Sequence, residues 1–188
     1  MIRGLLPLLL VVALSAGRAS ADEPAVPLDL QVDLISKILK YDRDFSARAN
    51  PLAKVLIVRR PGNVDSERIA RQMKAALGAA PTLGGAKHSE EEVLYTSADA
   101  LVSMARARKV CLVIFASGFD DEATNVARAF DGFDGLTATT QASAVEKGIV
   151  LGFDLVSGRP KMLLNLRQAR KQNADFRSDV LKIMKVYE

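Results

Sequence analysis

Cysteine and histidine are almost absent from the sequence, which contains one of each. A single cysteine, Cys111, excludes an internal disulfide, so the hydrophobic core must stabilise the fold. Cys111 lies in the apolar run 110–116, and a thiol in such a run usually acts as a small hydrophobic side chain. We therefore expect Cys111 to be buried in the core, without a redox or nucleophilic role.

Residues that would form a catalytic or metal site are also scarce. His88 stands beside the glutamates 90–92, but no second histidine or nearby cysteine completes a zinc site. Ser117 precedes Gly118 outside any G-x-S-x-G motif, and no base is placed beside it. The carboxylates at 120–122 stand where a helix should begin, which favours helix capping over cation binding. The sequence predicts neither a catalytic site nor a metal site.

Cofactor-binding motifs are missing as well. No G-x-G-x-x-G follows the first predicted strand, and Gly84-Gly85 lacks the lysine and hydroxyl of a phosphate-binding loop. These absences predict a protein that is not an enzyme and that needs no cofactor.

A long apolar run occurs only at the start of the chain. Arg3 precedes the apolar segment 5–16, and Ala19-Ser20-Ala21 has the small-x-small pattern of a cleavage site. This pattern is typical of a cleavable secretory signal peptide over residues 1–21, too short to span a bilayer. We expect residues 22–188 to form one exported, periplasmic domain.

An excess of charge of one sign is missing too. Removing Arg3 and Arg18 with the signal peptide lowers the formal net charge from +4 to +2. Nucleic-acid-binding domains usually carry a strong basic excess. We therefore expect no nucleic-acid partner and no contact with a membrane surface. The basic cluster of Arg167, Arg170 and Lys171 is interpreted as the solvated face of a helix.

Helical and strand patterns alternate along the rest of the chain. Helices are expected over 28–50 and after the candidate caps Asp65 or Ser66, Ser97, Asp120, Asn165 and Asp175. The last of these helices would carry a stripe of Phe176, Val180, Ile183, Met184 and Tyr187. Strands are expected over 54–58, 91–96, 110–116, 136–140, 148–156 and 160–165.

This alternation predicts a single α/β domain with a mainly parallel sheet flanked by helices. Ser157-Gly158 separates the last two strands and is typical of the turn in an antiparallel hairpin. Two helices are expected to close the chain after the hairpin. The run 110–116 is expected to be the central strand, and 91–96 an edge strand.

Three segments resemble a known family. They are VCLVIFAS (110–117), the strand that starts at Gly148, and MLLNLRQARKQNADFRSDVLKIMKV (162–186). They are similar to the YfiR family of exported bacterial regulatory proteins, which have a cysteine-containing strand, an I-N-L-x-x-A motif after a hairpin and a closing S-x-x-L-L-K helix. The matching residues are Cys111, Gly148, Asn165, Leu166, Ala169, Ser178, Leu181 and Lys182.

The resemblance implies a periplasmic, non-enzymatic regulator that binds the periplasmic part of an inner-membrane diguanylate cyclase and lowers cyclic-di-GMP signalling. It also implies a possible homodimer. Two departures stand out: family members often have further cysteines, and Tyr41 to Phe45 replace the family's F-x-x-W-P.

Two sets of residues are candidates for binding. Tyr41, Arg43 and Phe45 mix aromatic and charged side chains near the end of the first helix, a composition typical of protein interfaces. The alternative function is a small-ligand-binding module. Its site would use Arg59, Arg60, Ser117 and Gly118, which follow two buried strands.

Overall fold

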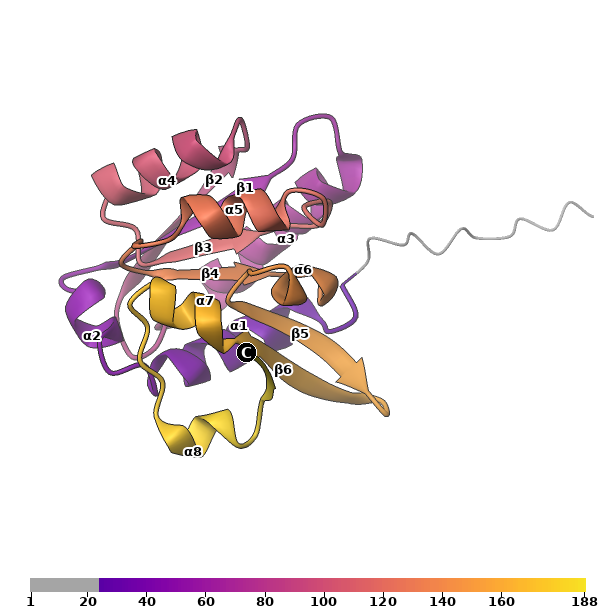
Figure 1. Cartoon of the computed structure of the whole chain (residues 1–188). Helices are drawn as coiled ribbons and strands as arrows, with labels where there is room; N and C mark the ends of the chain where they lie inside the picture. The colour runs from indigo at the N-terminus through magenta and orange to yellow at the C-terminus, as the bar shows by residue number, and fades with distance from the viewer. Residues whose placement is uncertain (1–23) are drawn as a thin grey trace, which may run out of the picture.

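The computed structural model describes residues 24–188 (Figure 1). The predicted signal peptide lies outside these residues. The helices are α1 (Leu28–Leu39), α2 (Phe45–Arg48), α3 (Val64–Ala79), α4 (Ala98–Ala107), α5 (Ala123–Ala129), α6 (Ser143–Glu146), α7 (Leu166–Lys171) and α8 (Ser178–Leu181). The strands are β1 (Ala53–Arg59), β2 (His88–Leu94), β3 (Leu112–Phe115), β4 (Leu136–Thr139), β5 (Leu151–Val156), β6 (Arg159–Asn165) and β7 (Lys185–Tyr187).

One sheet contains these seven strands in the order β2-β1-β3-β4-β5-β6-β7. All neighbouring strands are parallel except β5 and β6, which form an antiparallel hairpin. Ser157 and Gly158 both have positive φ, as a tight two-residue hairpin turn requires. The predicted fold class, a single α/β domain with a mainly parallel sheet and a C-terminal hairpin, is confirmed.

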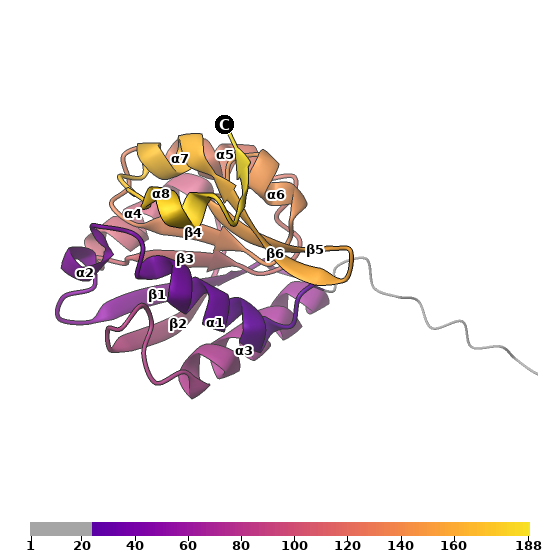
Figure 2. The same cartoon turned by 90° about the horizontal axis from the view of Figure 1, so that it is seen from below.

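Helices cover both faces of the sheet, because its inner strands are apolar on both sides. In β1, Val55 and Ile57 face one core while Leu56 and Val58 face the other. The first core packs against α1, α3 and α8, and the second against α4, α5 and α6. Figure 2 shows α1 and α3 together on one face, with α4 and α5 behind the sheet. The result is a three-layer α/β/α arrangement.

The first predicted helix is broken into two. α1 ends at Leu39, and α2 begins only at Phe45. Asp42 lies between them, fully buried, and its carboxylate pairs with Arg48 and accepts hydrogen bonds from the backbone N–H groups of Asp44 and Asp175. This buried polar group fixes a turn where the apolar periodicity alone predicts a continuous helix.

The capping predictions were partly wrong. Ser97 and Asn165 cap α4 and α7, because each side chain accepts a hydrogen bond from the backbone N–H three residues on. Asn63 caps α3 in the same way, in place of Asp65 or Ser66.

The end of the chain also differs from its prediction. Asp175 does not cap α8, whose N-cap is Arg177, and the helix ends at Leu181. The final residues form β7, which pairs with β6 through Leu163↔Lys185 to Asn165↔Tyr187. The predicted helical stripe is therefore wrong, because only Val180 lies in α8; Phe176 and Met184 are buried outside the helix, and Ile183 is exposed. The free edge of β6 offers backbone partners that a longer helix would leave unpaired.

Within residues 24–188, no helix is both long and apolar enough to cross a membrane.

Candidate functional site

The carboxyl ends of β1 and β3 lie side by side and carry the predicted ligand-binding residues. The connection from β1 leads to β2 at one edge, whereas the connection from β3 leads to β4 on the other side. Parallel sheets commonly bind ligands at such a reversal of strand order. The sequence therefore predicted Arg59, Arg60, Ser117 and Gly118 at the expected end of the sheet.

The Arg60 side chain crosses this crevice, and other groups of the protein bind its guanidinium. Its Nη2 lies 2.8 Å from Asp121 Oδ2, and its Nη1 contacts Asp121 Oδ1 and donates to the carbonyl oxygen of Gly118. The Arg60 guanidinium lowers the pKa of the Asp121 carboxyl, and the same pair raises the pKa of Arg60. Arg59 is also paired, with 3.0 Å between its Nη1 and Glu67 Oε1.

Ser117 and Gly118 are likewise part of the packing at this edge. Gly118 has φ +86°, and a Cβ there would lie 2.7 Å from Asn63 Nδ2, so the loop requires glycine. Its N–H donates to Gln141 Oε1 at 2.8 Å. Ser117 is fully buried, and its Oγ has no hydrogen-bond partner among the described residues. The structure brings Arg60, Ser117 and Gly118 together, with the Arg60 side chain lying across the crevice.

The acidic run after β3 was predicted to cap a helix, and this prediction was wrong. α5 begins at Ala123 without a side-chain cap, because all three carboxylates bind elsewhere. Asp120 pairs with Lys147, Asp121 with Arg60, and Glu122 accepts a 3.0 Å hydrogen bond from the Tyr95 hydroxyl. These contacts hold the loop after β3 against Arg60, Tyr95 and Lys147.

The three residues predicted to bind a protein partner differ in their exposure to solvent. Tyr41 is 36% exposed, and the Arg177 guanidinium carbon lies 5.6 Å from its ring centroid. Arg43 is exposed and pairs with Asp175 at 2.8 Å. Phe45 is only 2% exposed and cannot serve as a surface contact.

The burial of Phe45 has a clear structural cause. Its ring lies against Gly84, where a Cβ would come within 2.3 Å of the ring, and close to Leu39. Gly84 also has positive φ, which a larger residue rarely adopts. The Gly84-Gly85 segment is thus a turn that covers Phe45.

His88 and Cys111 have structural positions. The His88 ring nitrogens lie 3.1 Å from Glu90 Oε2 and 3.0 Å from the carbonyl oxygen of Ala80. Cys111 is 1% exposed just before β3, and burial raises the pKa of its thiol to about 11. The described residues contain no group of three metal-binding side chains. The expected burial of Cys111 is confirmed.

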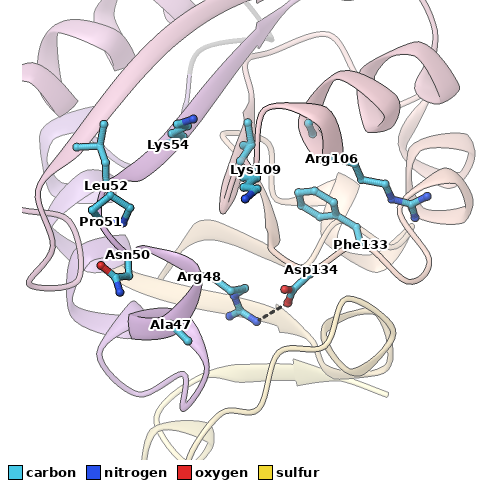
Figure 3. A pocket seen from close by; sticks show the side chains of 12 residues that line it. Ala47, Arg48, Asn50, Pro51, Leu52, Lys54, Arg106, Lys109, Phe133 and Asp134 are labelled. Carbon is cyan, nitrogen blue, oxygen red and sulfur yellow. Dashed lines mark ion pairs between the residues drawn. The ribbon is translucent and has the colours of Figure 1, made fainter.

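The opposite, amino edge of the sheet holds a hollow of about 640 Å³ (Figure 3). We call it the amino-edge pocket. Its walls come from α2, the start of β1, the end of α4, and the segments that precede β3 and β4. The lining residues are Ala47, Arg48, Asn50, Pro51, Leu52, Lys54, Ala105, Arg106, Lys109, Val110, Phe133 and Asp134.

Basic side chains dominate the charge of this pocket. Lys54 Nζ donates to the carbonyl oxygen of Arg108 at 3.0 Å, and Arg106 Nη2 donates to that of Asp131 at 3.1 Å. Among the described residues, no carboxylate forms an ion pair with Lys54, Arg106 or Lys109. All three residues are exposed, and Figure 3 shows the Arg106 guanidinium directed away from Arg48 and Lys109, beyond Phe133.

Arg48 is the buried cation of the amino-edge pocket, with a side chain only 4% exposed. It pairs with Asp42, and burial raises the pKa of that carboxyl despite the opposing effect of the guanidinium. Arg48 Nη1 also donates to the carbonyl oxygen of Asn173 at 3.0 Å and lies 3.5 Å from Asp134 Oδ1. Its Nε is buried without a hydrogen-bond partner among the described residues.

The sequence did not predict this pocket. The basic turn at 106–109 reads as an ordinary helix end, and Lys54 as one charge at a strand start. Only the tertiary fold brings them beside Arg48 and Phe133. The one local feature that marks the pocket is Lys109, whose backbone conformation is usually adopted by glycine.

No family model matches the chain, and no curated protein matches it. Several solved structures share its fold. One is an ABC domain from Streptococcus pneumonia in complex with L-Trp (13% identity, TM-score 0.60, covering 86% of this chain and 62% of that one). Another is a conserved domain protein from Vibrio cholerae O1 (14% identity, TM-score 0.59, covering 86% and 60%).

A third is a substrate-binding protein with adhesive properties from Clostridium difficile, in its ligand-free, open form (12% identity, TM-score 0.57, covering 87% and 60%). The chain therefore spans about three fifths of the length of the solved structures it resembles. At these identities the likeness establishes the fold. This fold is shared with a domain solved in complex with L-Trp and with a substrate-binding protein.

Proposed function

We propose that this protein is an exported, non-enzymatic binding protein whose small ligand occupies the amino-edge pocket. The observation that carries the proposal is the hollow of about 640 Å³, which combines unpaired cations with the accessible apolar side chains of Pro51 and Leu52. Ligand sites in proteins typically have volumes of about 300–1,000 Å³ and combine apolar walls with a few polar groups. The fold shared with substrate-binding proteins, one of them bound to L-Trp, supports the same function.

This proposal takes up the alternative function given by the sequence, small-ligand binding, in place of the regulatory role expected first, and it moves the site. At the carboxyl edge, Arg60 is held by Asp121 and Gly118, so a ligand would first have to displace an internal ion pair. At the amino edge, Lys54 and Lys109 are open to solvent and need no such displacement. Export rests on the signal-peptide pattern in residues 1–21.

A thermal-shift experiment tests the proposal. The purified protein is heated with a panel of amino acids that includes L-tryptophan, with aromatic carboxylates and with simple sugars. A ligand that binds the folded state raises the melting temperature in a concentration-dependent way. Compounds that raise it are then measured by calorimetry.

Filling the pocket provides the matched control. Ala47 is exposed and lines the hollow, whereas Ala75 is exposed on α3, outside it. Ala47→Trp is expected to abolish binding, and Ala75→Trp to leave it unchanged. If both variants bind as tightly as the unchanged protein, the ligand lies elsewhere and the proposal is wrong.

A regulatory role through the surface around Tyr41 is the second candidate. The exposed Tyr41 ring stacks near Arg177, and aromatic and arginine side chains are enriched where proteins bind one another. Arg177 belongs to the C-terminal segment that resembles the YfiR family. The proposed partner is the periplasmic part of an inner-membrane diguanylate cyclase or related sensor, with a homodimer as a further possibility implied by the resemblance.

Affinity capture from envelope extracts tests this second candidate. Tyr41→Ala is expected to lose the membrane signalling protein, whereas Tyr187→Ala should retain it. Tyr187 is a fair control because it is also partly exposed beside a cation, with Lys185 Nζ 4.8 Å from its ring centroid. Equal capture by both variants would argue against a contact through Tyr41.

A further inference from the structure

We infer that the amino-edge pocket selects an anionic ligand, bearing a carboxylate or phosphate group, and that Asp134 acts as an internal competitor for its cations. This inference rests on the proposed function, because it assigns the chemical class of the ligand that the pocket takes. It adds that one carboxylate of the protein itself sets the affinity.

The charge balance of the lining is the first argument. Lys54 and Lys109 contribute two positive charges that no described carboxylate pairs, and Arg106 adds a third that points away from the hollow, while Asp134 is the one acidic residue in the lining. The buried carboxylate of Asp42 pairs with Arg48 and largely neutralises its charge. A concave surface with an excess of one sign attracts ligands of the other sign.

The backbone at Lys109 is the second argument. α4 ends in a motif in which Lys109 N–H donates to the carbonyl oxygen of Arg106, and Val110 N–H donates to that of Ala105. In this motif the residue that follows the C-cap has a left-handed backbone conformation and is usually glycine. Lys109 holds this conformation, with φ +54°. A lysine in place of glycine costs backbone energy, and strained positions of this kind are concentrated at functional sites.

The position of Asp134 is the third argument. Its Oδ1 lies 3.5 Å from Arg48 Nη1, beyond an ordinary hydrogen bond, and its side chain is 71% exposed. Arg48 itself is nearly fully buried, with one nitrogen left without a partner. A ligand anion entering the hollow meets Arg48 where Asp134 now lies. Figure 3 shows Asp134 and Arg48 facing each other beside Lys109 and Phe133.

The apolar surface that a ligand can touch in the amino-edge pocket comes from Pro51 and Leu52, which are exposed and partly exposed. Phe133 lies behind this surface, 1% exposed, and its ring packs edge-to-face on Phe130 with 5.0 Å between centroids. An anion that also carries an apolar group therefore suits the lining.

Two probes that differ in charge alone test the inference. Indole-3-acetate and indole-3-acetamide have the same ring and nearly the same shape, and calorimetry compares their affinities for the purified protein. A charge-assisted contact favours the acetate by about tenfold or more. Added sodium chloride should weaken binding of the acetate and leave the amide unaffected. Inorganic phosphate serves as a third probe, for an anion that needs no apolar wall.

Three variants test whether binding of the acetate depends on the amino-edge pocket. Lys109→Gly suits the left-handed backbone and should fold at least as well, yet bind the acetate about tenfold more weakly. Asp134→Asn should bind it several-fold more tightly because the competitor is removed. Lys74→Gln, a lysine on α3 away from the pocket, should leave the affinity unchanged.

Each outcome decides a separate claim. Equal affinities for acetate and amide, both lost in Ala47→Trp, would overturn the anion inference and leave the proposed function standing. Weaker binding in Asp134→Asn would overturn the competitor role. Absence of binding by all three probes, with no response to the thermal-shift panel, would overturn both the inference and the proposed function.

Discussion

Arg60 and Asp121 form a two-pronged ion pair that joins the end of β1 to the loop after β3, with 2.8 Å between Arg60 Nη2 and Asp121 Oδ2. The pair bridges the reversal point of strand order, where a parallel sheet most often binds its ligand. Here the protein's own side chains span that position. The carboxyl edge is therefore held together electrostatically, and the amino-edge pocket lies at the opposite edge.

This ion pair predicts how stability depends on pH. Arg60 lowers the pKa of Asp121 below its ordinary value of 3.8, so the pair stabilises the fold fully above that value. The contribution is lost as the pH falls through the lower, folded-state pKa. Because Asp121 is mostly exposed, we expect the pair to contribute less than about 1 kcal/mol.

Urea unfolding from neutral to acidic pH measures the effect. Asp121→Asn should be slightly less stable than the unchanged protein at neutral pH, and the difference should disappear in acid. Glu92→Gln removes a carboxylate of β2 that forms no ion pair with a described residue and lies at no helix end, and should show no such difference. A constant gap between Asp121→Asn and the unchanged protein at every pH would contradict the prediction.

Truncation of Phe45 should destabilise the fold far more than truncation of Tyr41. Phe45→Ala removes a ring from the core beneath Gly84 and should lower the free energy of unfolding by about 3–5 kcal/mol. Tyr41→Ala removes an exposed ring near Arg177 and should cost less than about 1 kcal/mol. Denaturant midpoints of the two variants check this. Similar values for both would mean that the turn between α1 and α2 packs differently.

Cys111 should be inert while the protein is folded. Its thiol is buried, and a pKa of about 11 leaves very little thiolate at neutral pH. Iodoacetamide should therefore alkylate the native protein far more slowly than the protein unfolded in urea. Mass spectrometry over time gives both rates, and rapid native alkylation would show that β3 opens readily.

Gln172 should be more important for stability than its polarity suggests. It is fully buried beneath the sheet, where its Oε1 accepts a 3.0 Å hydrogen bond from the backbone N–H of Thr137, and its Nε2 donates to Thr137 Oγ1. β4 and β5 pair at a single position, Ala138↔Leu151, so this side chain replaces part of the strand ladder.

Gln172→Ala leaves the Thr137 N–H without a partner and should cost about 1–3 kcal/mol. Gln168→Ala, at a neighbouring buried glutamine that donates to Ala127 O, is the comparison. Thermal unfolding ranks the two variants. A negligible loss in Gln172→Ala would indicate that water replaces the amide.

Local patterns predicted the elements that have strong local signals. Apolar runs marked β1 and β3, Ser157-Gly158 marked the hairpin, and Ser97 and Asn165 marked helix starts. These features depend on neighbours in the sequence, so the sequence alone suffices to find them.

The features that were missed depend on distant residues. α1 ends early because Asp42 is buried against Arg48 and the backbone of Asp175, more than a hundred residues away. β7 forms because β6 leaves an edge unpaired, which no property of residues 185–187 reveals. The amino-edge pocket combines side chains from three separate segments of the sequence, 47–54, 105–110 and 133–134. Its charge excess is visible only once the fold has assembled them.

The β5–β6 hairpin extends beyond the body of the sheet (Figure 1). β4 pairs with β5 only at Leu151, and β7 pairs with β6 only from Leu163 onward, so the outer half has two open edges. Open edges of this kind, here with exposed Leu155 and Val156, invite pairing with other copies of the chain. Charged residues at 154, 159 and 161 oppose it. Solubility at high concentration therefore depends on these few charges, and replacing them with neutral residues would promote aggregation from the hairpin tip.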